Sequence, residues 1–368
     1  MSALPRATAQ RRRGASRRSA WLDWRAILGI VISLVLLWWT FRNEDLGEVF
    51  HEIATADPLF FILATALATF VFWIRAWRWK ALVDPVHRDT AFHSRFASVS
   101  IGFMGNNLLP MRIGEFARVY AFSRLEPVSL VASFSTLVIE RLLDAVFIVV
   151  SLFLAMAMPD FPAPVAARGF LTGARTLGVL VLIAFAILSM LVFFPQRTVA
   201  MMESVANRIL PRRFRRPVVD ALEAFLKGVG VLRDPVLLIR AGWWTAVLWL
   251  TNALGFWLAF MAFGLELPFT AAVFLQAAIA LFVSVPSGPG FFGLYEAAAK
   301  LVLIDFWGQA EAPALGFAAG FHLAGFIPIT LIGLYYARKV GMSLRAVAHT
   351  EEAVEEAVEE EAHLPEGS

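Results

Sequence analysis

The sequence predicts an all-α polytopic membrane protein with about six to eight transmembrane helices. Of its 368 residues, 59% are apolar and 17% are charged, whereas a soluble protein carries about 25% charged residues. The longest runs without Asp, Glu, Lys or Arg are residues 267–295, 312–337 and 241–265. Because about 20 apolar residues cross a hydrocarbon core of ~30 Å, these runs exclude a soluble globular domain.

The charges at the two ends of the chain predict its orientation. Residues 1–25 contain seven arginines and one aspartate, and residues 351–368 contain eight glutamates. A basic cluster beside an apolar segment indicates a cytoplasmic flank and contact with anionic lipid rather than with nucleic acid. We therefore expect a basic tail over 1–25, a transmembrane domain over 26–340 and an acidic tail over 341–368. Both termini are expected in the cytoplasm of a bacterial cell, with the protein in the inner membrane.

Uncharged runs divide the transmembrane domain into its elements. Spans are expected over 26–41, 58–74, 128–158, 176–196, 241–265 and 312–337. Residues 96–109 form a shorter run, and runs of 10–14 apolar residues are more typical of re-entrant segments. Residues 197–235 read as an amphipathic cytoplasmic connection. The run 267–307 is interrupted by a break, so the pattern leaves open whether it spans twice or dips in and returns.

Polar residues surround the break after residue 109. Pro110 and Gly114 interrupt the helix, and a broken backbone inside a membrane is tolerated only against protein or a water-filled cavity. Arginine offers a planar fork for phosphate oxygens. The residues expected to hold a lipid headgroup here are Asn106, Asn107, Arg112, Glu115 and Arg118. An interfacial helix with cytoplasmic arginines is the alternative.

A set of charges is expected inside the membrane. Glu140 and Asp144 are four residues apart on one helical face, with Arg141 between them. Such charges are costly unless they are paired, so a structural ion pair and a functional charge network are both open. Glu296 is expected to join this network. Arg75 and Arg78 lie in a basic, aromatic segment and are expected to anchor a membrane edge.

A second break lies within the longest uncharged run. Prolines and glycines that cannot continue a helix are concentrated here: Pro286, Gly288, Pro289, Gly290 and Gly293. The two breaks lie on opposite sides of the predicted topology, which is the arrangement of an inverted repeat with a site at the repeat interface. A plain turn between spans is the alternative. His322 lies alone inside a span, where it either packs or relays a proton.

Enzyme signatures are missing from the sequence. It contains no phosphate-binding P-loop, no H-E-x-x-H and no G-x-S-x-G motif. The histidines do not cluster at metal-ligand spacing, and the chain has no cysteine. We expect neither an enzyme nor a bound cofactor or metal.

Four segments together resemble a known family. They are RAWRW at 75–79, GNNLLPMRIGEFAR at 105–118, ERLLD at 140–144 and PSGPGFFGLYE at 286–296. In this order they resemble the lysylphosphatidylglycerol synthase transmembrane-region family, also called flippase-like membrane proteins, over about residues 25–340. The resemblance implies lipid translocation. The fuller synthases carry a cytosolic aminoacyltransferase domain after the membrane part, and this chain departs from them there.

These observations predict a flippase-like protein for a phospholipid or a polyprenyl-phosphate lipid. Its expected partners are membrane lipids with an anionic or phosphate-bearing headgroup, and further a second copy of the chain or a lipid-synthesis enzyme. Two alternatives remain. One is a scaffold for a lipid-modifying or glycan-assembling enzyme, and the other is a secondary transporter of a small solute.

Overall fold

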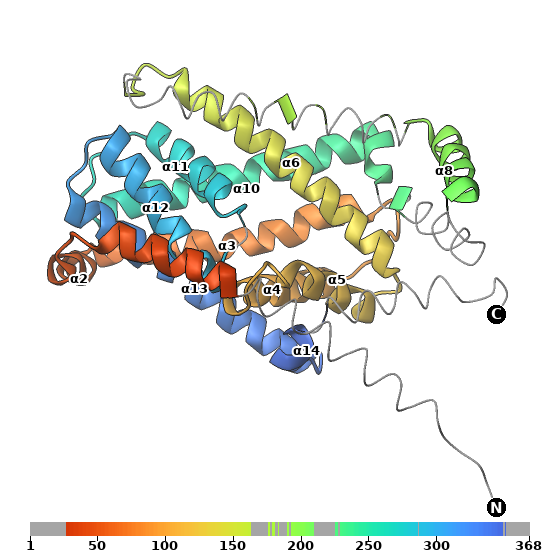
Figure 1. Cartoon of the computed structure of the whole chain (residues 1–368), viewed down its shortest axis with the longest axis horizontal. Helices are drawn as coiled ribbons and strands as arrows, with labels where there is room; N and C mark the ends of the chain where they lie inside the picture. Colours follow the sequence, from red (N-terminus) through yellow and green to blue (C-terminus); the bar gives the residue numbers. More distant parts are fainter. Residues whose placement is uncertain are drawn as a thin grey trace, which may run out of the picture.

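The computed structural model describes residues 27–162, 193–209, 225–226, 229–285, 287–348 and 350, with 176, 179–180, 183 and 190. The predicted basic tail, most of the span expected over 176–196, most of the acidic tail and Pro286 lie outside the described residues. Within the described part the secondary structure is helical and contains no strand (Figure 1). The elements after a first helix Ile27–Phe41 are α2 (Leu46–Thr55), α3 (Pro58–Val83), α4 (Phe92–Leu108), α5 (Gly114–Leu125), α6 (Leu130–Met156), α8 (Pro195–Ile209), η1 (Gly230–Arg233), α10 (Pro235–Ala262), α11 (Phe269–Phe282), η2 (Pro289–Phe291), α12 (Leu294–Lys300), η3 (Leu301–Phe306), α13 (Glu311–Lys339) and α14 (Leu344–Ala348).

Three long apolar helices, α3, α10 and α13, form the framework. Aspartate caps and proline at the first helical position start two of them, with Asp57 before α3 and Asp234 before α10. The two helices run antiparallel, because the N–H of Asp57 donates to the carbonyl of Ala262 at the far end of α10 (2.8 Å). Their other ends meet where the rings of Trp77 and Trp244 are 5.6 Å apart.

The number of apolar spans among the described residues is smaller than the sequence predicted. α3, α10 and α13 are long and apolar enough to cross a membrane, and the helix Ile27–Phe41 with α2, bent by 87°, would add a fourth. α6 has 27 residues, but every 18-residue stretch of it contains Glu140, Arg141 and Asp144. α11 has only 14 residues. The polytopic all-α class is confirmed. The span expected over 176–196 lies mostly outside the described residues and is not counted, and α6 and α11 are not counted because one is charged and the other is short.

Each predicted break forms the tip of a helical hairpin. The first joins α4 to α5 across residues 109–113, which include Pro110. The two helices pack at glycines, because a Cβ on Gly114 would lie 1.9 Å from the carbonyl oxygen of Gly102. The second hairpin joins α11 to α12 and η3 across residues 283–293. Phe274 and Trp307, near its two ends, have rings 5.4 Å apart, so the chain returns to the side from which it entered.

The two hairpins enter from opposite ends of the molecule and meet at their tips. α4 begins beside Trp77 of α3, whereas α11 begins just after the opposite end of the α3–α10 pair. In Figure 1, α11 and α12 lie toward the end that carries α2, and α5 lies toward the other. At the tips the N–H of Met111 donates to the carbonyl of Ser287 (3.3 Å). The run 267–307 therefore dips in and returns, and the pair has the opposed arrangement that the sequence predicted.

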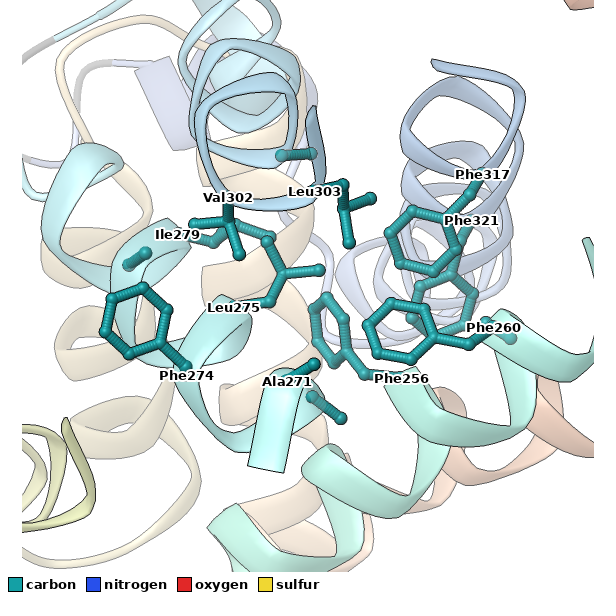
Figure 2. Close-up of a cluster of buried hydrophobic side chains, with 14 of the residues drawn as sticks. Phe256, Phe260, Ala271, Phe274, Leu275, Ile279, Val302, Leu303, Phe317 and Phe321 are labelled. Carbon is teal, nitrogen blue, oxygen red and sulfur yellow. The ribbon is translucent and has the colours of Figure 1, made fainter. Parts of the chain in front are cut away.

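A phenylalanine-rich core holds the second hairpin against the framework (Figure 2). Its buried side chains come from four elements: Phe256 and Phe260 of α10, Phe274, Leu275 and Ile279 of α11, Val302 and Leu303 of η3, and Phe317 and Phe321 of α13. Between helices in a membrane, close van der Waals packing of such side chains is what stabilises the contact. The base of the hairpin is therefore firmly packed, and its polar tip projects toward α4.

The first residues of the predicted acidic tail pack against the first hairpin. Met342 and Val347 are buried in a small cluster with Ile101, Met104 and Ala117 beneath the first hairpin. These apolar side chains cover the α4–α5 pair, so side-chain packing continues past residue 340 to Val347.

Candidate functional site

A buried ion cluster lies where α3, α5 and α6 meet. Its members, called the ion cluster below, are Arg78, Arg118, Glu140, Arg141 and Asp144. Glu140 and Asp144 share one face of α6 because they are four residues apart. α3 and α5 supply the arginines that meet this face.

Glu140 is the centre of the ion cluster. Both of its oxygens accept from Arg118, at 2.9 and 2.8 Å. Arg78 lies 2.9 Å and Arg141 2.7 Å from the same carboxylate. The guanidinium of Arg118 also lies 3.9 Å from the ring centroid of Trp79. Glu140 and Arg78 are both 0% exposed, so this carboxylate is fully desolvated and is held by three cations.

Asp144 extends the ion cluster toward α10. It is paired with Arg78, and its Oδ1 accepts from the indole N–H of Trp249 at 3.0 Å. Arg141 lies 3.7 Å away. Unlike the other cations of the cluster, the side chain of Arg141 is 38% exposed. It therefore lies at the edge of the cluster, where a ligand can reach it.

Two further arginines border this edge without a carboxylate partner. Arg75 interacts electrostatically with Asp144 and Arg141, and Arg112 with Glu115 and Arg141. No ion pair joins either of them to an acid in the described part of the chain. Nε and Nη1 of Arg75 and Nε of Arg112 are buried without a hydrogen-bond partner. Arg75, Arg112 and Arg141, with Glu115 beside them, are called the arginine site below.

The arginine site and the ion cluster together are positively charged. Arg75, Arg78, Arg112, Arg118 and Arg141 make five cations, and Glu115, Glu140 and Asp144 make three anions, so two positive charges are left over. This count already includes Glu115, which lies 4.0 Å from Arg141. An unpaired buried cation is costly, so the arrangement can bind an anion.

The backbone at the arginine site is strained. Met111 and Arg112 have φ of 64° and 57°, a left-handed conformation that costs a non-glycine residue roughly 1–2 kcal/mol. Such strain concentrates at ligand sites and switch regions. It aims the Arg112 guanidinium at the ring of Phe291 in the opposite hairpin tip, 5.6 Å from the centroid.

Two predicted roles are wrong. Arg78 is no membrane-edge anchor, because its fully buried side chain is paired with Glu140 and Asp144. Arg118 is no headgroup ligand, because it is 1% exposed and both of its terminal nitrogens donate to Glu140. Arg75, three residues before Arg78, also points into the protein, where its guanidinium lies 4.9 Å from the ring of Phe103.

The asparagines lie behind the arginine site. Asn107 donates to the hydroxyl of Thr330 (2.8 Å) and the carbonyl of Phe326 (3.3 Å), and so attaches α4 to α13. Asn106 is 5% exposed. Its Oδ1 packs so closely on Gly114 that a Cβ added to this glycine would lie only 2.6 Å from it. Both side chains support the packing of the first hairpin.

Glu296 does not join the ion cluster. It contacts His322, with Oε1 2.6 Å from Nδ1 of the imidazole. The sequence did not predict this contact, because the two residues are 26 positions apart on different helices. Sequence reasoning also missed Arg75 as a candidate anion-binding residue, although its spacing of three from Arg78 places both on one face of α3. Among the described residues no group of histidines and acids could hold a metal ion.

Comparison with known proteins identifies the family. The family described as the lysylphosphatidylglycerol synthase TM region matches residues 26–333. The chain belongs to this family. No solved structure matches.

Three archaeal relatives of this chain are UPF0104 membrane proteins. That of Pyrococcus horikoshii is 23% identical over 83% of this chain and 93% of its own length. That of Methanothermobacter thermautotrophicus is 24% identical over 79% of this chain and 87% of its own length. That of Methanocaldococcus jannaschii is 32% identical over 34% of this chain, which covers 38% of that protein.

Membership in the lysylphosphatidylglycerol synthase TM-region family makes the chain an integral membrane protein. The matched region contains both hairpins, the ion cluster and all of the arginine site. The unpaired arginines thus belong to the membrane domain that defines the family.

Proposed function

We propose that this protein translocates a lipid with an anionic, phosphate-bearing headgroup across a bacterial inner membrane, with both termini in the cytoplasm. The observation that carries the proposal is the pair Arg75 and Arg112, which are joined to no acid by an ion pair among the described residues and which each have a buried Nε without a hydrogen-bond partner. With the half-exposed Arg141, they offer planar donors that match phosphate oxygens. A bound phosphate would neutralise the excess charge of the arginine site.

The position of the arginine site suits alternating access. It lies at the tip of one hairpin and touches the tip of the other through Arg112 and Phe291. Sites between opposed broken elements are a recurring feature of transporters, in which one element moves against the other. A headgroup held at the tips could then be released toward either side, with its acyl chains remaining in the bilayer.

The proposed orientation is supported by the charges at the two ends. The end with α2 is acidic: it carries Arg42 and Lys300 together with Glu44, Asp45, Glu48, Glu52, Asp57, Asp160, Glu266, Asp305 and Glu311. The opposite end, called the basic end below, carries Asp84, Asp89, Glu126 and Asp234 together with Lys80, Arg88, Arg124, Arg233, Arg240, Arg338 and Lys339. Cytoplasmic flanks are enriched in lysine and arginine. We therefore assign the basic end to the cytoplasm.

The proposal is tested by lipid movement in vesicles that contain the purified protein. Fluorescent phosphatidylglycerol and a fluorescent neutral diacylglycerol are followed by chemical quenching of the outer leaflet. Arg75→Gln and Arg112→Gln should each slow phosphatidylglycerol at least about tenfold, since a lost charge-assisted hydrogen bond is worth about 1.5–3 kcal/mol. Neutral diacylglycerol should show no acceleration by the wild-type protein over its spontaneous rate.

The control is Arg124→Gln. Arg124 is exposed near the end of α5, on the same hairpin as Arg112, and its removal should leave the rate unchanged. Unaltered phosphatidylglycerol movement in both site variants would refute the role of the arginine site. Uptake of free phosphate without lipid movement would instead indicate a solute transporter.

A further inference from the structure

Glu296 and His322 form a buried pair at the base of the second hairpin tip. Nδ1 of the imidazole lies 2.6 Å from Oε1 of the carboxylate, and the two side chains are 10% and 3% exposed. Nε2 lies 2.9 Å from the carbonyl oxygen of Gly290. The second carboxylate oxygen accepts from the N–H of Gly293 at 2.6 Å. Every polar atom of the pair therefore has a partner.

These contacts determine how many protons the pair holds. A carbonyl oxygen can only accept, so Nε2 carries a hydrogen and donates it to Gly290. If Nδ1 and Oε1 both lacked a proton, two lone pairs would face each other at 2.6 Å. One proton must therefore lie between them, as an imidazolium with a carboxylate or as a neutral imidazole with a carboxylic acid.

We propose that Glu296 and His322 form a proton-binding site and that lipid movement is coupled to its occupancy. Release transfers the shared proton to water and leaves a neutral imidazole with hydrogen on Nε2 beside a carboxylate. The charge of the pair changes from zero to −1, and the Nδ1–Oε1 hydrogen bond is lost. The coupling rests on the proposed lipid translocation, whereas the proton site stands without it.

The site controls the conformation of the second hairpin tip. Its hydrogen bonds hold Gly290 and Gly293, which have φ of 67° and 88°. Between them lies Phe291, the ring under the guanidinium of Arg112. Because the same tip is hydrogen-bonded to Met111, a change at His322 reaches the arginine site through two direct contacts. The proton-bound state therefore corresponds to joined tips.

Few charged groups surround the pair. Tyr295 of α12 stacks on the imidazole with ring centroids 4.2 Å apart. Lys300, four residues after Glu296, is occupied by Glu44 at 2.6 Å. Two other charged groups lie on the side of the molecule that faces the pair: Glu52 of α2, which contacts Gly316 of α13, and Arg112, which lies beyond Phe291. The neighbouring elements α11, η2, the helix Ile27–Phe41 and the adjoining half of α10 contain no charged residue. The charge change is thus not offset by a neighbouring ion.

Glu296→Gln is the informative variant. Its amide N–H can donate to Nδ1 and its amide oxygen can accept from Gly293, so both hydrogen bonds of the proton-bound state persist without a titratable carboxyl. We expect its melting temperature to match that of the wild type. The control is Glu52→Gln, which removes a carboxylate packed against α13 at Gly316.

Infrared difference spectroscopy tests the proton site without any transport assay. Over the pH range in which the protein stays folded, the wild type and Glu52→Gln should show a carboxyl or imidazole band that changes as one proton is released. Glu296→Gln should lack this band. A band that persists in Glu296→Gln, or that is missing from the wild type, would overturn the proton site.

Vesicle measurements then test the coupling. Phosphatidylglycerol movement by the wild type and Glu52→Gln should rise with pH over the interval in which the band titrates, by at most about tenfold per pH unit for one proton. Glu296→Gln should be slow and independent of pH. A wild-type rate independent of pH would overturn the coupling. A titrating band in a protein that moves no lipid would uphold the proton site and overturn the proposed function.

Discussion

At the scale of single residues, the site is organised by which charges are saturated. Glu140 is fully buried between Arg78 and Arg118. Asp144 is paired with Arg78 and accepts a hydrogen bond from the indole of Trp249. Removing one member of a buried ion pair costs about 3–5 kcal/mol, because the remaining charge stays desolvated. Arg78 and Arg118 thus serve stability through their ion pairs. Arg75 and Arg112, which no ion pair joins to an acid among the described residues, remain available for a ligand.

This distinction predicts different stabilities for two arginine variants. Arg78→Leu should lower the melting temperature in detergent strongly, corresponding to about 3–5 kcal/mol, because it leaves both carboxylates without their most buried partner. Arg141→Leu should cost only about 1 kcal/mol, since its side chain is 38% exposed and water can replace it. Equal losses in the two variants would contradict this assignment, and Arg124→Leu provides the baseline for an exposed arginine.

At the scale of elements, glycines set the distance between the helices of the first hairpin. A Cβ on Gly114 would lie 1.9 Å from the carbonyl oxygen of Gly102 and 2.6 Å from the backbone nitrogen of Asn106. Both obstacles are backbone atoms of α4 that no rotamer change can move. The hairpin therefore tolerates no larger residue at this contact.

Gly114→Ala should consequently separate α4 from α5. We expect a loss of about 3 kcal/mol or more, at the upper end of overpacking effects, together with loss of lipid movement as Arg112 is displaced. The matched control is Gly242→Ala in α10, where an added Cβ meets nothing within 4 Å and alanine should stabilise the helix by up to about 1 kcal/mol. A stable and active Gly114→Ala protein would show that the helices do not pack this closely.

The joined hairpin tips predict a cross-link that stops transport. The backbone hydrogen bond of 3.3 Å between Met111 and Ser287 brings the two residues into direct contact, and a disulfide needs such close approach. Met111→Cys with Ser287→Cys should form a disulfide on mild oxidation and block phosphatidylglycerol movement until it is reduced. The control pair is Asp160→Cys with Thr270→Cys, whose side chains are 3.1 Å apart at the base of the second hairpin. Undiminished transport by the oxidised tip pair would show that the tips need not separate.

At the scale of the whole molecule, the sequence predicted the parts that depend on local pattern. Long uncharged runs located α3, α10 and α13, and proline and glycine located both hairpin tips. The spacing of Glu140 and Asp144 placed them on one face of α6. Partners on other helices were not predictable, because Arg78 and Asp144 are 66 positions apart. The same reason hid the pairing of His322 with Glu296, whose separation carries no periodic signal.

The distribution of charge over the folded molecule predicts its orientation in the membrane. Folding gathers residues from distant segments at each end: Asp57 of α3 meets the end of α10, and Glu44 pairs with Lys300. The opposite end joins Asp84 to Arg240 at 3.8 Å. Since lysine and arginine are retained on the cytoplasmic side, the end with α2 should face outward.

Single cysteines test this orientation, because the natural chain has none. Glu48→Cys and Ala310→Cys replace exposed residues at the end with α2. Asp89→Cys and Arg124→Cys replace exposed residues at the basic end. In intact cells a membrane-impermeant thiol reagent should label the first two and spare the others, and all four should react after the membrane is permeabilised. Labelling of Asp89→Cys and Arg124→Cys in intact cells would reverse the orientation. The first hairpin, which opens at the basic end, would then enter from outside, and the arginine site would first meet lipids of the outer leaflet.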